Sequence, residues 1–594
     1  MAESCPINTF PKAWDTEIAK AASIVFAVCF ALYSFSLPRG PVFGDGLEFV
    51  ATAAVRGVPH PTGYPLFIEA LSPFASSYTN AAMVCSFFAA CAAACWTLLC
   101  GRLLRKTLDV LPSPFPLLCI IGLGLAGGLS SGLWGQATLV EVYGLNALLM
   151  LGALVILCSK LDSALCWRQL TVAGLLLSLG LANHLSILAV FPLFGFRLVE
   201  SFRKQHLGIR SLPFPLLAVS LPAIILYGLL MLRAAQNPAI NWGNAESVDG
   251  LMWLLTGGDY KSSQFLQERP GTPFTLETWL PHAISILINC VVQYGGQLFG
   301  FHPLSNDFSR YLYKTMGFFQ IGLVVWGLKV LWTQNRFQFA GLLLGIAFLL
   351  FLLLTYRIPD ISDYFLSLYV MMAAPLLIGL NELIQLIIKH FEYHLPEKRI
   401  RLVIFMGLLA FLSFMANSKV GMRQNHQTAR LVLERMTLSL PENALLITHG
   451  DYDIYGMWYA QLVQGKKREV LVVGANFMRQ PWYGAMLPAE GTDPHGRFVK
   501  AKPGHFSQFT AEDQYAMIRN QIIMPNASRV PIFTTDTDPL MLQYLSQEFR
   551  LTVVENLLSQ EEYDLFLEQG VLATAIPTQL YRIEPLAGNA PPQP

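Results

Sequence analysis

Two carboxylates and a histidine lie close together in a short polar stretch of an otherwise apolar chain. Asp45 and Glu48 stand three residues apart within Val42 to Pro65, and His60 follows in the same stretch. Carboxylates so close together can exchange protons with a substrate or hold one divalent cation. No third ligand follows at metal-ligand spacing, so a divalent metal is not expected here.

The residues around these groups predict how the chain presents them. If a helix begins near Gly46, Asp45 is its N-cap and both carboxylates lie at the positive end of that helix. Three prolines in Val58 to Pro65 exclude regular helix, so His60 and Tyr64 are expected on a stiff loop. An ordinary N-cap with its capping-box partner, followed by a rigid turn, would explain the same pattern.

Other polar residues near the ends of apolar runs are candidates for substrate binding, because ionisable groups near a bilayer are costly. The guanidinium group among them suits a phosphate, and the indole ring suits a sugar. Each also has a structural alternative: an interfacial aromatic belt, the capping of a helix break, a plain turn or a surface ion pair. The candidates are Glu141, Tyr143, Asn183, His184, Trp242, Arg357 and Asp363.

The composition is that of an integral membrane protein. Of 594 residues, 54% are hydrophobic and only 13% are charged, and the formal net charge of +1 gives no reason to expect a nucleic-acid partner. The ten cysteines fall between Cys5 and Cys290, mostly inside apolar runs, so no disulfide framework is indicated. The first apolar run lacks the features of a cleaved signal peptide and is expected to remain as a span.

Apolar runs recur along residues 1–418, which we expect to form the membrane domain. The basic residues of the short loops can all face the cytoplasm only if Leu170 to Phe196 forms two short helices that break near Asn183 and His184. This gives about eleven spans, a cytoplasmic N-terminus, and loops 38–80 and 235–312 on the outer face. Ala283 to Phe301, which polar residues interrupt, is expected to be an interfacial helix. The runs are Ile18 to Leu37, Ala81 to Leu99, Phe115 to Leu133, Val140 to Leu157, Leu170 to Phe196, Phe214 to Leu232, Thr315 to Leu331, Phe339 to Thr355, Phe365 to Ile388 and Leu402 to Met415.

Residues 419–586 are polar and predict a soluble α/β domain on the outer side. Short runs of strand-forming residues alternate there with helical stretches such as Asp451 to Val463 and Ala511 to Gln521. His449 to Asp453 follows a predicted strand and resembles a small-ligand loop, but an N-capped turn is the preferred interpretation. Residues 587–594 look disordered. The predicted strands are Ala444 to Thr448, Glu469 to Val473, Val530 to Thr534 and Leu551 to Val554.

Six of these segments, in this order, resemble a known family. The chain is similar to the transmembrane protein 260-like protein O-mannosyltransferases and their bacterial relatives, within the GT-C class of lipid-dependent glycosyltransferases. Gly46-Leu47 and Thr62 depart from the family pattern, which has Ser-Gly and a second proline there, but the charged side chains are kept. The matching segments are GDGLEF from Gly44, GVPHPTGYPLF from Gly57, WGQATLVEVYGLNALL from Trp134, GLANHL from Gly180, NWGN from Asn241 with the later Tyr260, and Ile358 to Tyr364.

The resemblance implies a polytopic α-helical transferase of the GT-C type with a C-terminal α/β domain. It would move a sugar, mannose or another hexose, from a polyprenyl-phosphate donor to a hydroxyl of a protein or glycan acceptor, most simply a Ser or Thr. Asp45 would be the base in a single displacement that inverts the sugar, and Glu48 would orient Asp45 or the acceptor. Arg357, His60 and His184 would contact the leaving phosphate. No nucleotide, cofactor or obligatory metal is implied.

Two other classes of function remain open from the sequence. A transporter or lipid flippase would also contain broken helices and polar residues in its spans, and a non-catalytic scaffold would tolerate changes at Asp45 and His60. The expected location is a bacterial inner membrane with the C-terminal domain in the periplasm. The endoplasmic reticulum membrane is the alternative.

Overall fold

The computed structural model describes fifteen stretches of the chain. The chain forms two compact units. The helical unit comprises Met1–Leu37, Ala82–Tyr227 and Ser262–Arg423, and the sheet unit comprises Pro38–Ala81, Gly228–Lys261 and Gln424–Pro594. The described residues are 12–108, 114–159, 163–258, 260, 275–299, 307–358, 361–390, 407–408, 414, 417–418, 422, 426–478, 480–487, 510–568 and 576–586.

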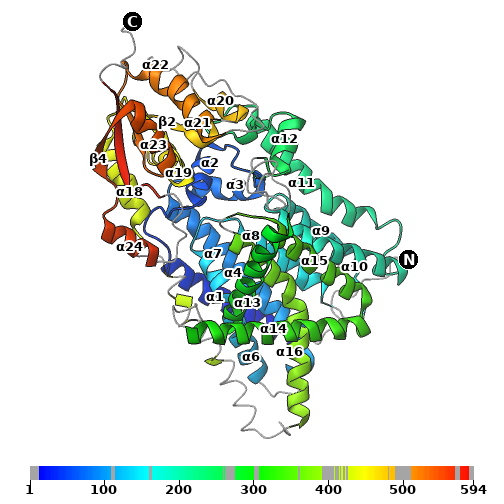
Figure 1. Cartoon of the computed structure of the whole chain (residues 1–594). Coiled ribbons are helices and arrows are strands. Elements are labelled where there is room, and N and C mark those ends of the chain that lie inside the picture. Colours follow the sequence, from blue (N-terminus) through cyan, green and yellow to red (C-terminus); the bar gives the residue numbers. More distant parts are fainter. Residues whose placement is uncertain are drawn as a thin grey trace. The chain divides into compact units, whose positions relative to one another are not determined.

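The helical unit is built from long apolar helices with short connections (Figure 1). The first turn of α4 and the last turns of α11 belong to the sheet unit. The described helices of the helical unit are α1 (Lys12–Phe35), α4 (Tyr78–Leu103), α5 (Arg105–Leu108), α6 (Phe115–Gly128), α7 (Ser131–Ala137), α8 (Tyr143–Leu157), α9 (Trp167–Leu181), η2 (Leu185–Val190), α10 (Phe191–Arg203), α11 (Pro213–Ala234), α13 (Leu276–Phe299), α14 (Asp307–Gln334), α15 (Arg336–Thr355), η5 (Ile361–Tyr364) and α16 (Phe365–His390).

Within the described stretches, seven helices are long and apolar enough to cross a membrane, or eight if the bent pair α6 and α7 is one span. The protein is therefore a multi-pass membrane protein, as predicted. These helices account for seven or eight of the about eleven predicted crossings. The run at Val140 to Leu157 folds as α8, which is shorter than a full span. Most of Leu402 to Met415 and all of residues 587–594 lie outside the described residues.

The predicted break at Asn183 and His184 is confirmed. Helix α9 ends at Leu181, and the chain resumes at Leu185 as η2, which continues into α10. The His184 side chain accepts the N–H of Ser186, and the amide of Asn183 donates to the carbonyl of Val142 at 3.1 Å. His184 thus serves a backbone N–H that the break leaves unpaired, and Asn183 ties the break to the start of α8.

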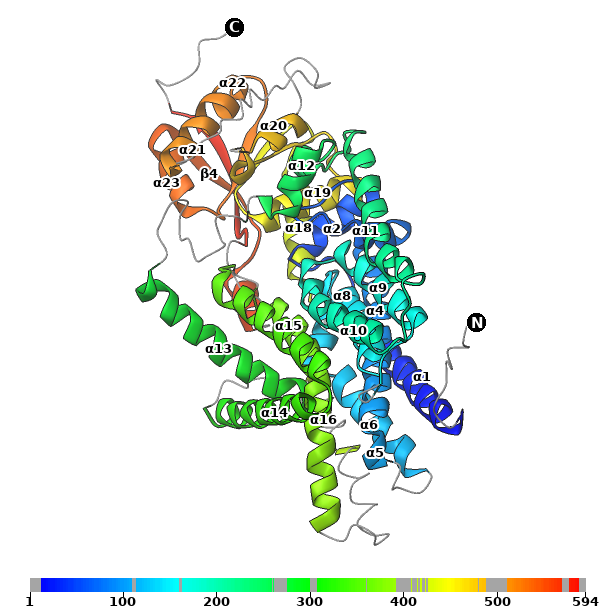
Figure 2. The same ribbon diagram turned by 90° about the vertical axis from the view of Figure 1, so that its right-hand side faces the viewer.

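Helices α13, α14, α15 and α16 pack against one another in the helical unit (Figure 2). The closest approach is between α14 and α16, where a Cβ at Gly327 would meet the carbonyl of Pro375 and a Cβ at Gly379 would meet that of Leu323. Small residues let membrane helices approach in this way. The run predicted as an interfacial helix forms part of α13, which is not among the seven candidate spans in the described part of the chain.

The sheet unit joins the first loop to the C-terminal α/β region. Val58 pairs with Asn241 in a short parallel bridge, so residues 228–260 are tied to the same loop. Its described elements are α2 (Gly46–Val55), α3 (Pro65–Leu71), η1 (Ser72–Phe74), η3 (Trp242–Asn244), α12 (Val248–Leu255), α18 (Thr428–Ser439), β1 (Leu445–Thr448), α19 (Asp451–Leu462), β2 (Leu471–Gly474), η6 (Ala475–Phe477), α20 (Pro481–Met486), α21 (Ala511–Met517), the π-helix η7 (Ile518–Ile523), α22 (Met524–Asn526), β3 (Ile532–Thr535), α23 (Pro539–Glu548), β4 (Phe549–Asn556), α24 (Gln560–Glu568) and β5 (Gln579–Pro585).

The C-terminal region contains a five-stranded mixed sheet in the order β2-β1-β3-β5-β4. Strand β1 pairs in parallel with β2 and β3, while β5 is antiparallel to both β3 and β4. Strands β1 to β3 are buried throughout, as expected for parallel strands covered on both faces. The predicted α/β fold and its four predicted strands are confirmed, and β5 is an additional strand that the prediction missed.

Candidate functional site

The first loop positions Asp45 directly before the first residue of α2. Gly44, with φ of +131°, makes the turn that leads into this helix. Asp45 occupies the N-cap position as predicted, but its side chain makes no capping hydrogen bond. The capping-box alternative is therefore wrong for this carboxylate. With 37% of its side chain exposed, Asp45 can be reached by a substrate.

Glu48 lies one turn further along α2 and is fully buried against His60. One carboxylate oxygen accepts the backbone N–H of His60 at 2.9 Å, and the other contacts the ring Nδ1. On the opposite side of the ring, His60 Nε2 lies 3.6 Å from Asp45 Oδ2. The structure therefore connects the two predicted carboxylates through one imidazole ring.

The hydrogen bonds around His60 indicate its protonation state. Tyr64 donates its hydroxyl proton to the carbonyl of Pro61 at 2.8 Å, so its oxygen can only accept from His60 Nε2, 3.3 Å away. Nε2 thus faces two acceptors, Tyr64 and Asp45, while Nδ1 faces the carboxylate of Glu48. From this network we assign a proton to each ring nitrogen, which makes the ring an imidazolium held between two carboxylates.

Asp45 is also tuned toward basicity. Burial among protein atoms raises its pKa, the positive charge of His60 lowers it, and the negative charge of Glu48 raises it again. The net direction is upward. A carboxylate with a raised pKa is a stronger base and holds an abstracted proton more readily near neutral pH.

Aromatic rings surround His60 within the sheet unit. Phe49, Tyr64, Trp242 and Tyr260 have ring centroids between 5.1 and 6.2 Å from the imidazole. They leave only 7% of the His60 side chain exposed. The rings therefore fix the orientation of the imidazole and exclude water from it.

Trp242 was predicted to stack on a sugar, but its ring is only 2% exposed. Trp482 stacks on it with a centroid distance of 4.5 Å and an interplanar angle of 27°, and Phe477 packs against it edge-on at 5.0 Å. No face of the ring is free for a sugar in this arrangement. Its packing assigns Trp242 to the support of His60 instead.

A second polar cluster lies in the helical unit. Tyr143, His184 and Tyr364 form a triangle whose ring centroids are 5.1 to 5.6 Å apart. His184 Nδ1 contacts Ser186 at 2.8 Å, and Ser186 contacts Ser367 at 2.9 Å. The structure therefore brings the predicted residues Tyr143 and His184 together, and it adds Tyr364, which the prediction had placed only within a matching segment.

Three predicted residues lie at the ends of helices in the same unit. Glu141 is half-buried just before α8, Arg357 is exposed just after α15, and Asp363 is half-buried in η5. Arg357 interacts electrostatically with His282 on α13. Their predicted roles in substrate binding stay predictions.

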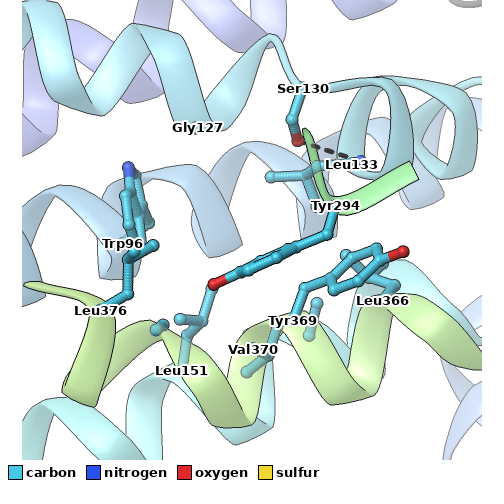
Figure 3. Close-up of a pocket in the computed structure, with 12 residues that line it drawn as sticks. Trp96, Gly127, Ser130, Leu133, Leu151, Tyr294, Leu366, Tyr369, Val370 and Leu376 are labelled. Carbon is cyan, nitrogen blue, oxygen red and sulfur yellow. Dashed lines mark hydrogen bonds between the residues drawn. The ribbon is translucent and has the colours of Figure 1, made fainter. Parts of the chain in front are cut away.

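A partly open apolar cavity lies in the helical unit (Figure 3). It is lined by side chains such as Trp96 of α4, Leu151 of α8, Tyr294 of α13 and Tyr369 of α16. The rings of Tyr294 and Tyr369 stack with centroids 4.9 Å apart, and the Tyr294 hydroxyl points toward Trp96 and Leu151. Among the described residues that hydroxyl has no hydrogen-bond partner. The sequence had not pointed to this cavity, because its lining consists of ordinary membrane-helix residues.

No group of three His, Cys, Asp or Glu side chains with metal-binding geometry occurs among the described residues. At the first loop the reason is visible in the contacts. Both oxygens of Glu48 are engaged by His60, so Asp45 and Glu48 do not face each other as a chelating pair.

Two regions of the chain match known domains. Residues 45–207 match the N-terminal domain of protein O-mannosyl-transferase TMEM260, and residues 427–583 match TMEM260-associated domain 2. The protein O-mannosyl-transferase TMEM260 of Mus musculus is 23% identical over 506 residues, which cover 79% of this chain and 64% of the mouse protein. The chain thus spans just under two thirds of that relative's length.

Two solved structures are similar to the chain as a whole. ArnT from Cupriavidus metallidurans bound to undecaprenyl phosphate superposes with a TM-score of 0.49 and 10% identity over 98% of this chain and 100% of that one. The Archaeoglobus fulgidus oligosaccharyltransferase, in complex with zinc and sulfate, superposes with a TM-score of 0.44 and 13% identity over 89% of this chain and 69% of that one.

Proposed function

Because this chain belongs to the TMEM260 protein O-mannosyl-transferase family, whose N-terminal domain and associated domain 2 it carries, we propose that it is a membrane glycosyltransferase of the GT-C type. It would take a sugar from a polyprenyl-phosphate carrier and pass it to a hydroxyl of a protein acceptor, with Ser or Thr the simplest case. The observation that carries this proposal is the arrangement of Asp45, His60 and Glu48: an accessible carboxylate with a raised pKa, held by a buried ion pair.

Asp45 is the proposed general base. Its exposed carboxylate accepts the proton of the acceptor hydroxyl while that oxygen attacks the anomeric carbon of the sugar. The bond from that carbon to the phosphate oxygen breaks, and the lipid phosphate leaves with the electron pair. One displacement of this kind inverts the configuration of the sugar.

His60 and Glu48 act through Asp45. The imidazolium keeps the adjacent carboxylate oriented and ionised until the acceptor's proton arrives, and Glu48 keeps the imidazolium charged and fixed. We therefore assign both as positioning residues. We no longer assign phosphate binding to His60, because both of its ring nitrogens already face protein oxygens.

The apolar cavity of the helical unit suits the isoprenoid part of such a donor. Its lining is aromatic and aliphatic, as an uncharged hydrocarbon chain requires. Arg357 and His184 remain our candidates for the phosphate, since a leaving phosphate needs cationic or donor groups and little acid assistance. The proposed location is a bacterial inner membrane with the sheet region in the periplasm, with the endoplasmic reticulum membrane as the alternative.

The proposal is tested by incubating purified protein in detergent with a panel of radiolabelled polyprenyl-phosphate sugars and a Ser/Thr-rich peptide. Lipid-dependent labelling of the peptide is expected and would identify the sugar. The competing function is transport or flipping of a lipid, for which no residue of the first loop needs a raised pKa. Movement of a substrate across liposomes by a protein that consumes none of the donors would favour that alternative.

Removal of divalent metal is expected to leave the transfer rate largely unchanged. Glu48 is committed to His60, so the two carboxylates cannot chelate a cation as they stand. The measurement compares initial rates in EDTA with rates in EDTA plus excess Mg²⁺ or Mn²⁺. A rate that collapses in EDTA and returns with either ion would contradict this prediction.

A further inference from the structure

Helix α19 of the C-terminal region packs directly on α2, the helix that carries Glu48. Tyr452 in its first turn lies against Phe43 with ring centroids 5.2 Å apart. Tyr459, two turns later, accepts the backbone N–H of Tyr78 at 3.1 Å. All of these residues belong to the sheet unit, so the start of α19 is held beside the first loop (Figure 1).

Asp451 is the first residue of α19, and the fold does not use its carboxylate. The cap of this helix is Asp453, which accepts the backbone N–H groups of His449 and Gly450 at 3.2 and 3.0 Å and is also bonded by Thr535. Among the described residues, Asp451 makes no hydrogen bond or ion pair, and its side chain is exposed. A carboxylate without a structural task, fixed on a rigid helix, is available to a ligand.

The surroundings of Asp451 make this placement costly. The charged groups that reach it are Asp45 and Glu48 from the first loop, Asp453 from its own helix, and His60, which alone is positive. Tyr260 and Tyr455 are the other titratable groups nearby. Although the Asp451 side chain is partly open to solvent, the protein atoms packed around its carboxylate desolvate it and raise its pKa to about 7, and the three like charges add to this shift. Four carboxylates around one imidazolium repel one another and are destabilising unless a substrate satisfies them.

A second observation, next to His60 in the same unit, points to a missing polar molecule. The indole N–H of Trp242, whose ring lies 6.1 Å from His60, is buried with no acceptor in the described part of the chain. The indole N–H of Trp482, stacked on it, is in the same state. Buried donors are nearly always paired, so two unpaired donors are expected where a ligand with oxygen acceptors completes the network.

We propose that Asp451 binds the acceptor, so that the C-terminal domain forms the acceptor side of the transfer site. The inference rests on the proposed function and deepens it. The hydroxyl that gives its proton to Asp45 must sit beside that carboxylate, and Asp451 begins the helix that packs on α2 and lies against Phe43. The hydrocarbon part of a lipid donor needs membrane helices, whereas α19 comes from a soluble α/β fold. The ligand is a polypeptide segment carrying Ser or Thr, and Asp451 hydrogen-bonds its backbone N–H.

The test measures peptide binding separately from sugar transfer. A fluorescent Ser/Thr-rich peptide is titrated into wild-type protein, Asp451→Asn and Asp451→Ala, and its anisotropy is recorded. Loss of a hydrogen bond to this carboxyl group should weaken peptide binding about tenfold or more in the alanine variant. The matched control is Glu442→Gln, which removes an exposed carboxylate of the same domain and should bind as the wild type does.

Two further readouts keep the inference distinct from a loss of folding and from the proposed function. The unfolding temperature of each variant should be no lower than that of the wild type, because Asp453 makes the capping hydrogen bonds of α19 and the substitution removes a charge that its neighbours repel. Slow hydrolysis of the lipid-linked sugar by water should be unchanged, because it needs no peptide. Equal peptide affinity in wild type and Asp451→Ala overturns the inference. Peptide binding that depends on Asp451, without any sugar transfer, overturns the proposed function alone.

Discussion

Asp45→Asn is expected to lower the rate of sugar transfer by about 10²- to 10⁴-fold, the usual contribution of a general base. The amide keeps the size of the side chain but cannot accept the hydroxyl proton. Since burial raises the pKa of Asp45, the wild-type rate should also fall as pH drops through that raised pKa, because a base works only when deprotonated. The measurement is initial rate against pH with the identified donor and a Ser/Thr peptide.

The matched control for this prediction is Asp249→Asn, an exposed acid of the sheet unit in the first turn of α12. It should retain wild-type activity and the wild-type pH profile. Donor binding and the unfolding temperature of Asp45→Asn should be close to those of the wild type, since the Asp45 side chain makes no capping hydrogen bond to α2. Transfer by Asp45→Asn at a rate close to that of the wild type would remove this residue from the mechanism.

The second large effect is expected at the His60–Glu48 pair. His60→Gln and Glu48→Gln should each lower kcat by about 10²-fold through loss of the geometry at Asp45, with little change in KM. The double variant should be no worse than either single one, because the two residues act on Asp45 as one unit. The measurement is a double-mutant cycle on kcat and KM.

Tyr64→Phe serves as the control for that cycle. It removes the weak contact to His60 at 3.3 Å and the hydrogen bond to the carbonyl of Pro61, and it leaves the contacts of His60 to both carboxylates in place. We therefore expect a loss much smaller than that of either member of the pair. Strictly additive losses in the double variant would mean that His60 and Glu48 serve separate functions.

The sequence predicted what local chemistry determines. The start of α2 at Gly46 follows from the glycine turn and the apolar run behind it, and the break before Leu185 follows from Asn183 and His184 in an otherwise apolar stretch. The parallel strands were found because each is a short buried run of branched residues. Strand β5 was missed, since Gln579–Pro585 is mixed in polarity and becomes a strand only by pairing with β3 and β4.

The arrangement of the site was only partly predictable. His60, Asp45 and Glu48 are close in sequence, and their grouping was expected, but the role of the ring as a bridge depends on side-chain directions that spacing does not give. The sequence around Trp242 does not show whether its ring stacks on a sugar or, as in the structure, on Trp482. The electrostatic interaction of Asp451 with Asp45 joins residues about 400 positions apart, and no local pattern in His449 to Asp453 could have predicted it.

The most direct test of the central claim is the configuration of the sugar in the product. A polyprenyl-phosphate sugar of defined anomeric configuration is incubated with excess enzyme and peptide, and the product linkage is determined by NMR. Direct displacement by a hydroxyl that Asp45 deprotonates predicts complete inversion at the anomeric carbon. Retention of configuration, which requires two displacements, would contradict the account.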